Sequence, residues 1–356
     1  MYSLLRSLLF RLDPETAHQL TLRLLRVAGN FPPSNWLIAQ LYQTPPKPVQ
    51  AFGLTFNNPV GLAAGYDKDG IAIHGLAALG FGHLEIGTVT PQPQAGNPRP
   101  RVFRLLEDEG VINRMGFPGK GADDVSRRLL RQKEHPPRND IIIGVNLGKN
   151  KDTPLEDATQ DYIELLRRFI FIANYLTINI SSPNTVGLRR LQGREMLEQL
   201  LGEIKKEREF TLTRFNKLSV APNPSPIGRG GRVPILVKIS PDLTEEELDD
   251  AVGVILDKGM NGIIATNTTL ARVGLRSRYR GEAGGLSGSP LAAGSEAVLR
   301  RVVKRVDGRV PVVSAGGIMN PDDAMKRLAL GASLVQVYTG LIYRGPKLVQ
   351  QIVKSL

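Results

Sequence analysis

Eight short apolar segments recur along the chain, and helical patterns separate most of them. Apolar strands that alternate with helices are typical of a parallel α/β architecture, in which helices cover the strands. The count of eight favours an α/β fold of the (β/α)8, or TIM barrel, type over an open sheet. The predicted strands are Val60–Ala64, His83–Val89, Ile141–Leu147, Tyr175–Ile180, Ile235–Ile239, Gly262–Ala265, Val310–Ser314 and Ser333–Tyr338.

Polar side chains or glycines follow every one of these strands. The fourth strand runs directly into Ser181-Ser182-Pro183-Asn184, and Lys238 interrupts the otherwise apolar fifth. One such end is usually a turn. The carboxyl ends of all barrel strands meet at one rim, however, where barrel enzymes carry their active sites, so the eight ends predict one site. Its candidate residues include Ala64, Gly65, Lys68, Thr88, Asn146, Asn179, Thr266, Asn267, Thr268, Gly317, Tyr338 and Thr339.

Two kinds of chemistry are compatible with this rim. Lys238 or Lys68 is a candidate nucleophile for a Schiff-base aldolase. Alternatively, the glycines after strands seven and eight, the usual phosphate position of such barrels, anchor FMN while a lysine balances negative charge on the reduced flavin. The many Asn and Thr side chains favour the flavoenzyme, because a flat heterocycle rich in carbonyl and N–H groups requires several donors and acceptors.

Two amphipathic helical patterns precede the barrel pattern. Leucines from Leu4 to Leu12 mark the first, and Asp13-Pro14-Glu15 supplies an N-cap, a proline and an early acid for the second. We expect residues 1–45 to form a helical extension and residues 46–356 to form the barrel domain. The apolar stripes fit packing on the barrel, and together with their neighbouring arginines they also fit a membrane surface. The pattern alone leaves both open.

Two segments interrupt the strand–helix repeat. Residues 96–119 form a long connection with several prolines and glycines, and connections of this length in compact domains are usually functional. Residues 209–232 are rich in proline, glycine and serine, which predicts an inserted surface loop before the fifth strand.

Composition excludes several classes of function. The 356 residues include no cysteine, which excludes disulfides, thiolate metal sites and a cysteine nucleophile, and the four histidines show no metal-ligand spacing. The net charge of +12 favours anionic partners, but aromatic content is only 6% and no nucleic-acid-binding motif is present, so we expect no nucleic-acid partner. No apolar run is long enough to span a bilayer, and no secretory cleavage site follows the N-terminus.

Eight blocks of sequence are long and specific: GLAAGYDKDG, EIGTVTPQPQAGNPRPRVFRL, INRMGF, VNLGKNKDTP, INISSPNT, ATNTT, GGLSG and SLVQVYTG. Together they resemble the dihydroorotate dehydrogenase family, and within it the class 2, quinone-dependent, membrane-associated enzymes. The resemblance covers nearly the whole chain, and the N-terminal DPETAHQLTLRLL resembles the class 2 helical extension that forms the quinone entrance. The lack of cysteine agrees with class 2, which uses a serine base where class 1 uses cysteine. Pro118 is a departure, since many members have Asn there, and it could alter how the loop over the substrate closes.

The resemblance implies a role for several residues. Ser182 is the expected catalytic base, which removes the C5 proton of dihydroorotate while a hydride leaves C6 for FMN. Because a serine hydroxyl is a poor base, a relay through Thr185 or water is expected, and Lys238 is expected to stabilise the reduced flavin. The implied FMN contacts are Ala64, Gly65, Lys68, Thr88, Asn146, Asn179, Lys238, Thr266, Gly288, Gly317, Tyr338 and Thr339. The implied substrate contacts are Lys68, Asn113, Arg114, Met115, Gly116, Phe117, Asn179, Asn184, Asn267 and Thr268.

The resemblance also implies a setting for the protein. Dihydroorotate would be oxidised to orotate in de novo pyrimidine biosynthesis, and membrane quinone would reoxidise the flavin through the N-terminal helices. We therefore expect a monomeric, peripheral membrane protein at the cytoplasmic face of a bacterial cell membrane, whose N-terminal helices contact anionic head groups. An aldolase that uses Lys238 or Lys68 is the alternative.

Overall fold

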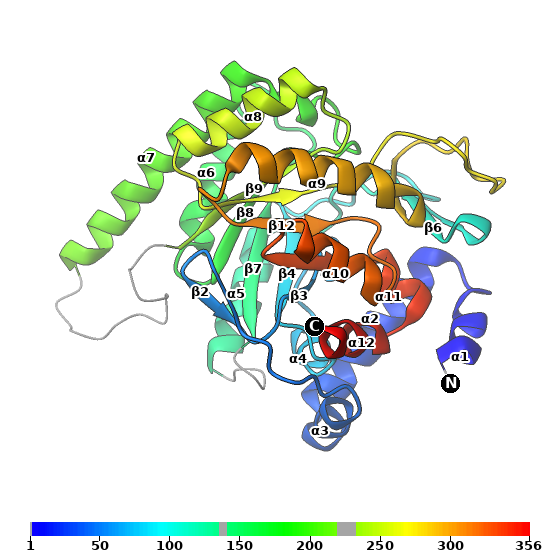
Figure 1. Ribbon diagram of the computed structural model, residues 1–356. Helices are drawn as coiled ribbons and strands as arrows, with labels where there is room; N and C mark the ends of the chain where they lie inside the picture. The colour runs from blue at the N-terminus through cyan, green and yellow to red at the C-terminus, as the bar shows by residue number, and fades with distance from the viewer. Residues whose placement is uncertain (1, 135–140, 219–232) are drawn as a thin grey trace.

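A closed barrel of eight parallel strands forms the centre of the molecule (Figure 1). The computed structural model describes residues 2–134, 141–218 and 233–356. All eight predicted strands are confirmed, and their ends shift by at most two residues. They are β3 (Val60–Leu62), β4 (His83–Val89), β7 (Ile142–Leu147), β8 (Tyr175–Asn179), β9 (Ile235–Ile239), β10 (Gly262–Ala265), β12 (Val312–Ala315) and β13 (Leu334–Val337). The strands follow one another around the barrel in chain order, and β13 pairs with β3 to close it.

Helices cover the outside of the barrel. They are α4 (Ile73–Ala77), α5 (Gly121–Glu134), α6 (Ala158–Phe169), α7 (Arg194–Leu218), α8 (Glu245–Asp257), α9 (Ala292–Val306), α10 (Pro321–Ala329), α11 (Thr339–Arg344) and α12 (Lys347–Ser355). Local sequence explains where two of them begin. Thr244 and Glu247 form a reciprocal capping box at the start of α8. At the start of α10, the Asn320 side chain accepts the N–H of Asp323, and a proline occupies the first turn.

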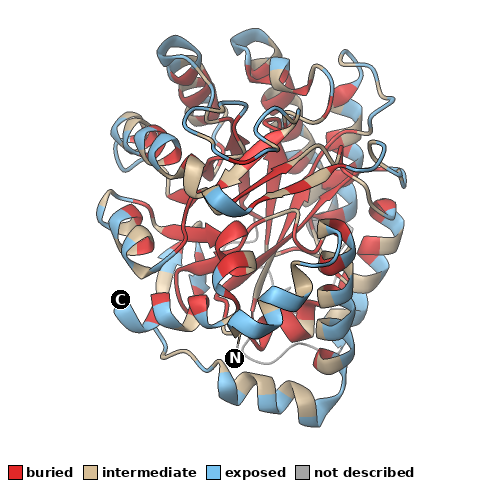
Figure 2. Ribbon diagram, turned by 90° about the vertical axis from the view of Figure 1, so that its right-hand side faces the viewer, coloured by how far each residue is buried: buried red, intermediate tan, exposed pale blue. Residues whose placement is uncertain are grey.

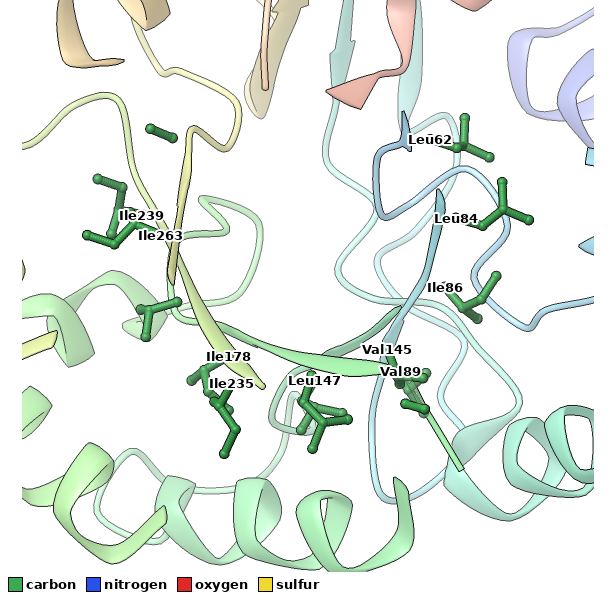
Figure 3. Packing of buried hydrophobic residues seen from close by; sticks show 14 of the residues in the cluster. Leu62, Leu84, Ile86, Val89, Val145, Leu147, Ile178, Ile235, Ile239 and Ile263 are labelled. Carbon is green, nitrogen blue, oxygen red and sulfur yellow. The ribbon is translucent and has the colours of Figure 1, made fainter. Parts of the chain in front are cut away.

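Successive residues of each barrel strand point alternately towards the helices and into the barrel. Leu147 and Ile178 face outward and belong to the main core, which they form together with side chains of the covering helices (Figure 3). Tyr175 faces inward at the amino-terminal end of the barrel, where a hairpin of β1 (Val49–Ala51) and β2 (Leu54–Phe56) packs. Each fully buried side chain of this kind contributes about 1.5–3 kcal/mol. The interior of the carboxyl end is polar instead.

The long connection after β4 is structured. It forms a hairpin of β5 (Val102–Leu105) and β6 (Gly110–Asn113), to which β11 (Gly285–Gly288) adds a third antiparallel strand from far along the chain. The pairing places Asn113 opposite Gly285. This small sheet therefore brings residues of the connection next to the segment that follows β10, at the rim where the barrel strands end.

Three helices precede the barrel: α1 (Tyr2–Leu9), α2 (Pro14–Asn30) and α3 (Pro32–Leu41). The two predicted helices are confirmed, and Asp13 caps α2 as expected. The third helix, α3, is not predicted from the sequence. It begins with Pro32-Pro33, and proline is favoured in the first turn of a helix. α2 packs against α4 and β5, whereas α1 and α3 contain no fully buried residue (Figure 2).

The prediction of a loop over residues 209–232 is wrong for residues 209–218, through which α7 continues. Phenylalanine and threonine lower the helix propensity of this stretch, but no proline or glycine interrupts it. Leu212 packs against the core, and Thr211 donates a hydrogen bond to Glu207 one turn earlier. Tertiary packing therefore extends the helix. Residues 219–232 lie outside the described part of the chain.

Candidate active site

A buried carboxylate lies inside the barrel beneath the strand ends. Glu85 on β4 has a side chain with no solvent exposure, and it accepts four hydrogen bonds of 2.8–3.3 Å from Asn146, Gln336, Tyr175 and Thr177. The Lys238 Nζ lies 3.9 Å from Glu85 Oε1, which is beyond hydrogen-bond length. Neutral donors thus satisfy the Glu85 oxygens, and the Lys238 ammonium is available to another group.

Lys238 points into the barrel because its neighbours in β9, Val237 and Ile239, face the helices. The residue is 5% exposed. Burial lowers the pKa of Lys238, and the nearby Glu85 charge opposes this shift. A buried ammonium without a hydrogen-bonded anion is costly, so an electron-rich or anionic ligand beside Lys238 would stabilise the site.

Side-chain amides and hydroxyls connect neighbouring strand ends above Glu85. Thr88 Oγ1 donates to Asn146 Oδ1 (2.6 Å), and Asn179 Nδ2 lies 2.9 Å from each of these oxygens. Asn267 Nδ2 donates to Asn179 Oδ1 (3.3 Å) and to Ser181 Oγ (3.0 Å). Each group in this network fixes the orientation of the next, so the rim presents donors and acceptors in a defined pattern.

Ser182 and Asn184 leave the end of β8. Ser182 is 5% exposed, and its Oγ accepts the N–H of Asn184 at 3.2 Å. Asn184 Nδ2 donates to Asn113 Oδ1 (3.0 Å), whereas Asn184 Oδ1 is buried and has no hydrogen-bond partner among the described residues. Because buried amide oxygens are rarely left unsatisfied, this oxygen is suited to accept a hydrogen bond from a ligand N–H beside Ser182.

Glycines occupy the end of β11 and the turn after β12. Gly288 has φ +92° and Gly317 has φ +72°, conformations that favour glycine. A Cβ on Gly317 would lie 2.2 Å from the Ala292 Cα, and a Cβ on Gly288 would lie 2.3 Å from the Glu109 carbonyl oxygen. Both positions therefore require glycine, and both residues line the cavity. The turn after β12, the seventh barrel strand, is a position where such barrels often bind a phosphate.

One cavity of about 850 Å³ joins these groups. Its volume is that of a site for a drug-sized ligand. The structure brings the following predicted residues to its wall: Ala64, Gly65, Lys68, Thr88, Asn113, Met115, Gly116, Phe117, Asn179, Ser182, Asn184, Lys238, Thr266, Asn267, Thr268, Gly288, Gly317, Tyr338 and Thr339. Asn146 is not on the wall and contacts it through Thr88 and Asn179. Arg114 is also not on the wall, since its guanidinium pairs with Glu282 and lies over the Phe103 ring.

The N-terminal helices form another wall of the same cavity. Their lining is mainly apolar: Tyr2, Leu5, Leu9, Phe10, Ala17, Leu24, Leu25, Ala28, Ile38 and Leu41. His18 on α2 contacts the Tyr66 ring edge to face at 4.9 Å, and Tyr66 contacts Tyr338 at 5.5 Å. Burial, assisted by the Lys68 charge, lowers the pKa of His18 to about 4, so the imidazole is neutral at pH 7. A row of aromatic rings thus leads from α2 to the end of β13.

The sequence predicts no role in the site for three residues that shape it: Glu85, Glu15 and Arg101. Glu85 could have been recognised as a lone carboxylate in an apolar strand, because burying a charge is costly unless it is paired or hydrogen-bonded. Glu15 is predicted only as an early acid of α2, yet it is buried and binds Arg101, 86 residues further along the chain. No local pattern reveals a pair at that separation.

The fold and this cavity define the class of protein: a (β/α)8-barrel enzyme with glycine turns suited to a phosphate and a buried lysine beside an amide-rich rim. A family model described as dihydroorotate dehydrogenase matches residues 48–356. The chain belongs to the dihydroorotate dehydrogenase family.

Individual relatives match the chain over its full length. A protein from Flavobacterium lutescens named dihydroorotate dehydrogenase (quinone) is 47% identical over all of this chain and 96% of its own. A protein of the same name from Acidithiobacillus ferrooxidans is 48% identical over all of this chain and 94% of its own. The crystal structure of ligand-free DHODH from Eimeria tenella matches with a TM-score of 0.84 at 41% identity, over 96% of this chain and 93% of that one. These similarities do not favour the aldolase.

Proposed function

We propose that this protein is a quinone-dependent dihydroorotate dehydrogenase that holds FMN, oxidises dihydroorotate to orotate in pyrimidine biosynthesis and passes the electrons to membrane quinone. Full-length relatives are named dihydroorotate dehydrogenase (quinone), which supports the proposed activity and electron acceptor. The observation that carries the proposal is the shared cavity, whose wall includes both the polar strand ends around Ser182 and the apolar side chains of α1 to α3. A polar substrate and an apolar acceptor require these two kinds of surface.

The residues of the rim fit FMN. Bound FMN would supply the acceptor for the C6 hydride and the carrier of electrons to quinone. Lys238 offers a buried positive charge for the reduced ring. The glycine turns offer peptide groups for the phosphate. The residues we assign to FMN are Ala64, Gly65, Lys68, Thr88, Asn146, Asn179, Lys238, Thr266, Gly288, Gly317, Tyr338 and Thr339.

We assign proton removal to Ser182. Its Oγ accepts one hydrogen bond, from the Asn184 N–H, which leaves the hydroxyl proton free to be passed on. A serine hydroxyl is too weak a base to keep the C5 proton, so the proton must leave through a relay, to which we assign Thr185 or a water. Thr185 is buried close by in the chain, so it is shielded from bulk solvent.

Amides that converge on Ser182 are suited to hold the substrate. Asn184 and Asn113 are already hydrogen-bonded to each other, and Asn267 belongs to the network that begins at Asn179. Such groups match the ring amides and the carboxylate of dihydroorotate, and Lys68 adds positive charge, although burial lowers its pKa to about 8. The residues we assign to the substrate are Lys68, Asn113, Arg114, Met115, Gly116, Phe117, Asn179, Asn184, Asn267 and Thr268. Arg114 would act on it indirectly, because the cavity wall does not include it.

We assign residues 1–45 to acceptor entry and membrane contact, and residues 46–356 to the catalytic barrel. Exposed apolar side chains on α1 to α3 include Leu4, Leu8, Leu24, Val27, Phe31 and Trp36, and Arg11, Arg23 and Arg26 lie exposed among them. An interfacial helix surface needs both features. Among the described residues, no helix is both long enough and apolar enough to cross a bilayer.

This setting corresponds to a peripheral protein on the cytoplasmic face of a bacterial cell membrane. We also propose that the protein works as a monomer.

A comparison of electron acceptors tests the proposed function. Purified protein is mixed with dihydroorotate and with a long-tailed quinone, fumarate or NAD⁺, and orotate formation is followed by its absorbance. We expect turnover with quinone that exceeds turnover with the other two acceptors, and turnover on the order of a hundredfold lower in Ser182→Ala, which controls for contaminating activity. Preferred turnover with fumarate or NAD⁺, or no orotate with any acceptor, would contradict the proposal.

A further inference from the structure

A buried arginine lies behind the glycine turn that ends β12. Arg327, on α10, is 2% exposed. Its Nη2 donates to the Ala292 carbonyl (2.7 Å) and to Ser295 Oγ (3.1 Å), and the same nitrogen reaches the Gly316 carbonyl at 3.4 Å. Arg327 therefore ties the turn after β12 to the start of α9. These two segments meet at Gly317, where a Cβ would collide with Ala292.

Among the residues that the structure describes, no carboxylate pairs with the positive charge of Arg327. Its Nη1 is buried and lacks a hydrogen-bond partner among the described residues. The two carboxylates whose charges act on it, Glu296 and Asp323, bind other groups: Glu296 pairs with Lys326 at 2.9 Å, and Asp323 accepts the Met319 N–H at 2.8 Å. A buried cation without a paired anion is costly. A bound anion nearby would offset that cost.

We propose that Arg327 is a positioning residue for the phosphate group of the flavin cofactor. The inference rests on the proposed FMN-dependent function and extends it to a residue outside the cavity. Gly316 and Gly317 line the cavity and Arg327 does not, so the guanidinium acts through the turn. Its hydrogen bonds to the carbonyls of Gly316 and Ala292 keep the peptide groups of the turn in a fixed orientation. Its positive charge favours a dianion bound on the cavity side of the turn.

The test compares two flavins that differ only in the phosphate. FMN and riboflavin are titrated into the flavin-free full-length protein, and binding is followed by flavin fluorescence. In Arg327→Met we expect FMN affinity to fall on the order of tenfold or more, and riboflavin affinity to change less than about threefold. Arg327→Lys should recover part of the loss, since it keeps the charge but not the planar fork of donors.

A matched control is the neighbouring lysine. Lys326→Met removes the same charge from the same helix, but the Lys326 side chain is 62% exposed and pairs with Glu296. FMN affinity of this variant should stay within about twofold of wild type, because exposed charges are well screened.

Three results would overturn the assignment. Unchanged FMN affinity in Arg327→Met would remove any role, and a parallel loss of both flavins would mean that Arg327 only supports the fold. An equal loss of FMN affinity in Lys326→Met would mean that general surface charge is responsible. If Arg327→Met does not fold, Arg327→Gln provides the same comparison. A wild-type chain that binds neither flavin would refute the FMN-dependent function itself, and this inference with it.

Discussion

The ion pair between Glu15 and Arg101 fastens the N-terminal helices to the substrate side of the barrel. Glu15 Oε1 lies 2.7 Å from Arg101 Nη2, and Oε2 accepts a hydrogen bond from Arg101 Nε at 3.1 Å. Both side chains are less than 10% exposed. Arg101 Nη1 donates to the carbonyls of Ala95 (2.7 Å) and Asn97 (2.8 Å), and Asn97 in turn donates to the Asn184 carbonyl (3.2 Å). We therefore expect Glu15→Gln to loosen the docking of α2.

The size of the effect follows from these contacts. Removal of one partner from a buried ion pair costs about 3–5 kcal/mol, because the remaining charge is left buried. Glutamine keeps one acceptor oxygen, and Arg101 keeps its two carbonyl partners, so we expect a smaller cost of about 2–3 kcal/mol. If α2 opens as a local unit, its amide hydrogens should exchange about 30- to 150-fold faster.

Hydrogen exchange measured by mass spectrometry tests this expectation. Arg99→Gln is the matched control: Arg99 also pairs with Glu15, at 3.0 Å, but its side chain is 60% exposed. An exposed pair contributes about 0–1 kcal/mol, so the control should accelerate exchange by less than about fivefold. Exchange of α2 in Glu15→Gln that equals wild type or the Arg99 control would refute the reasoning.

The pH dependence provides a second measure of the same pair. Burial raises the pKa of Glu15, but the hydrogen bonds and charges of Arg101 and Arg99 outweigh it and hold the pKa below its ordinary value of 4.5. A carboxyl group with a depressed folded pKa stabilises the folded form fully above pH 4.5, and this contribution is lost as the pH falls through the folded pKa. Wild-type α2 should therefore loosen below about pH 4.5, whereas α2 in Glu15→Gln should show no such dependence on this group.

Variants at Ser182 and Lys238 and a deletion of the N-terminal helices test the assigned roles. Ser182→Ala should retain FMN and bind orotate but reduce the flavin on the order of a hundredfold more slowly in stopped-flow. Ser181→Ala should lose less activity, because the Ser181 hydroxyl accepts a hydrogen bond from Asn267 and is not on the cavity wall. Near-normal reduction in Ser182→Ala would place the catalytic base elsewhere. Lys238→Ala should weaken FMN binding or slow flavin reduction, and Lys238→Arg should not restore it fully; full FMN occupancy with an unchanged reductive half-reaction would contradict the role of Lys238. Deletion of Met1–Phe31 should leave an FMN-containing barrel that dihydroorotate still reduces, with sharply lower turnover with long-tailed quinone and lower binding to anionic vesicles. Unfolding or loss of flavin would make these helices structural, and full quinone activity would place acceptor entry elsewhere.

The barrel and its rim are predictable from sequence because their signals are local. Each strand is a short apolar run, and each run is followed by the groups that it carries to the rim, as Tyr175–Asn179 is followed by Ser182. Strand order in the barrel equals chain order. Residues at successive strand ends in the sequence are therefore also neighbours around the rim of the site.

The remaining features depend on contacts between distant parts of the chain. The small sheet forms only when Gly285–Gly288 pairs with Gly110–Asn113, and the Glu15–Arg101 pair likewise has no local signal. Residues 209–218 are helical because they continue a packed helix, against their own weak propensity. Arg327 reads as an ordinary basic residue at the end of an amphipathic helix, and only the fold places it under the glycine turn.

The central claim is that this barrel takes electrons from dihydroorotate through a flavin to quinone. An anaerobic absorption spectrum of the purified protein tests it most directly. We predict a flavin spectrum that dihydroorotate bleaches and that a long-tailed quinone then restores. A flavin that dihydroorotate leaves oxidised would contradict the substrate. A colourless protein whose Lys238 or Lys68 is trapped by borohydride in the presence of a carbonyl compound would contradict the whole account and select the aldolase.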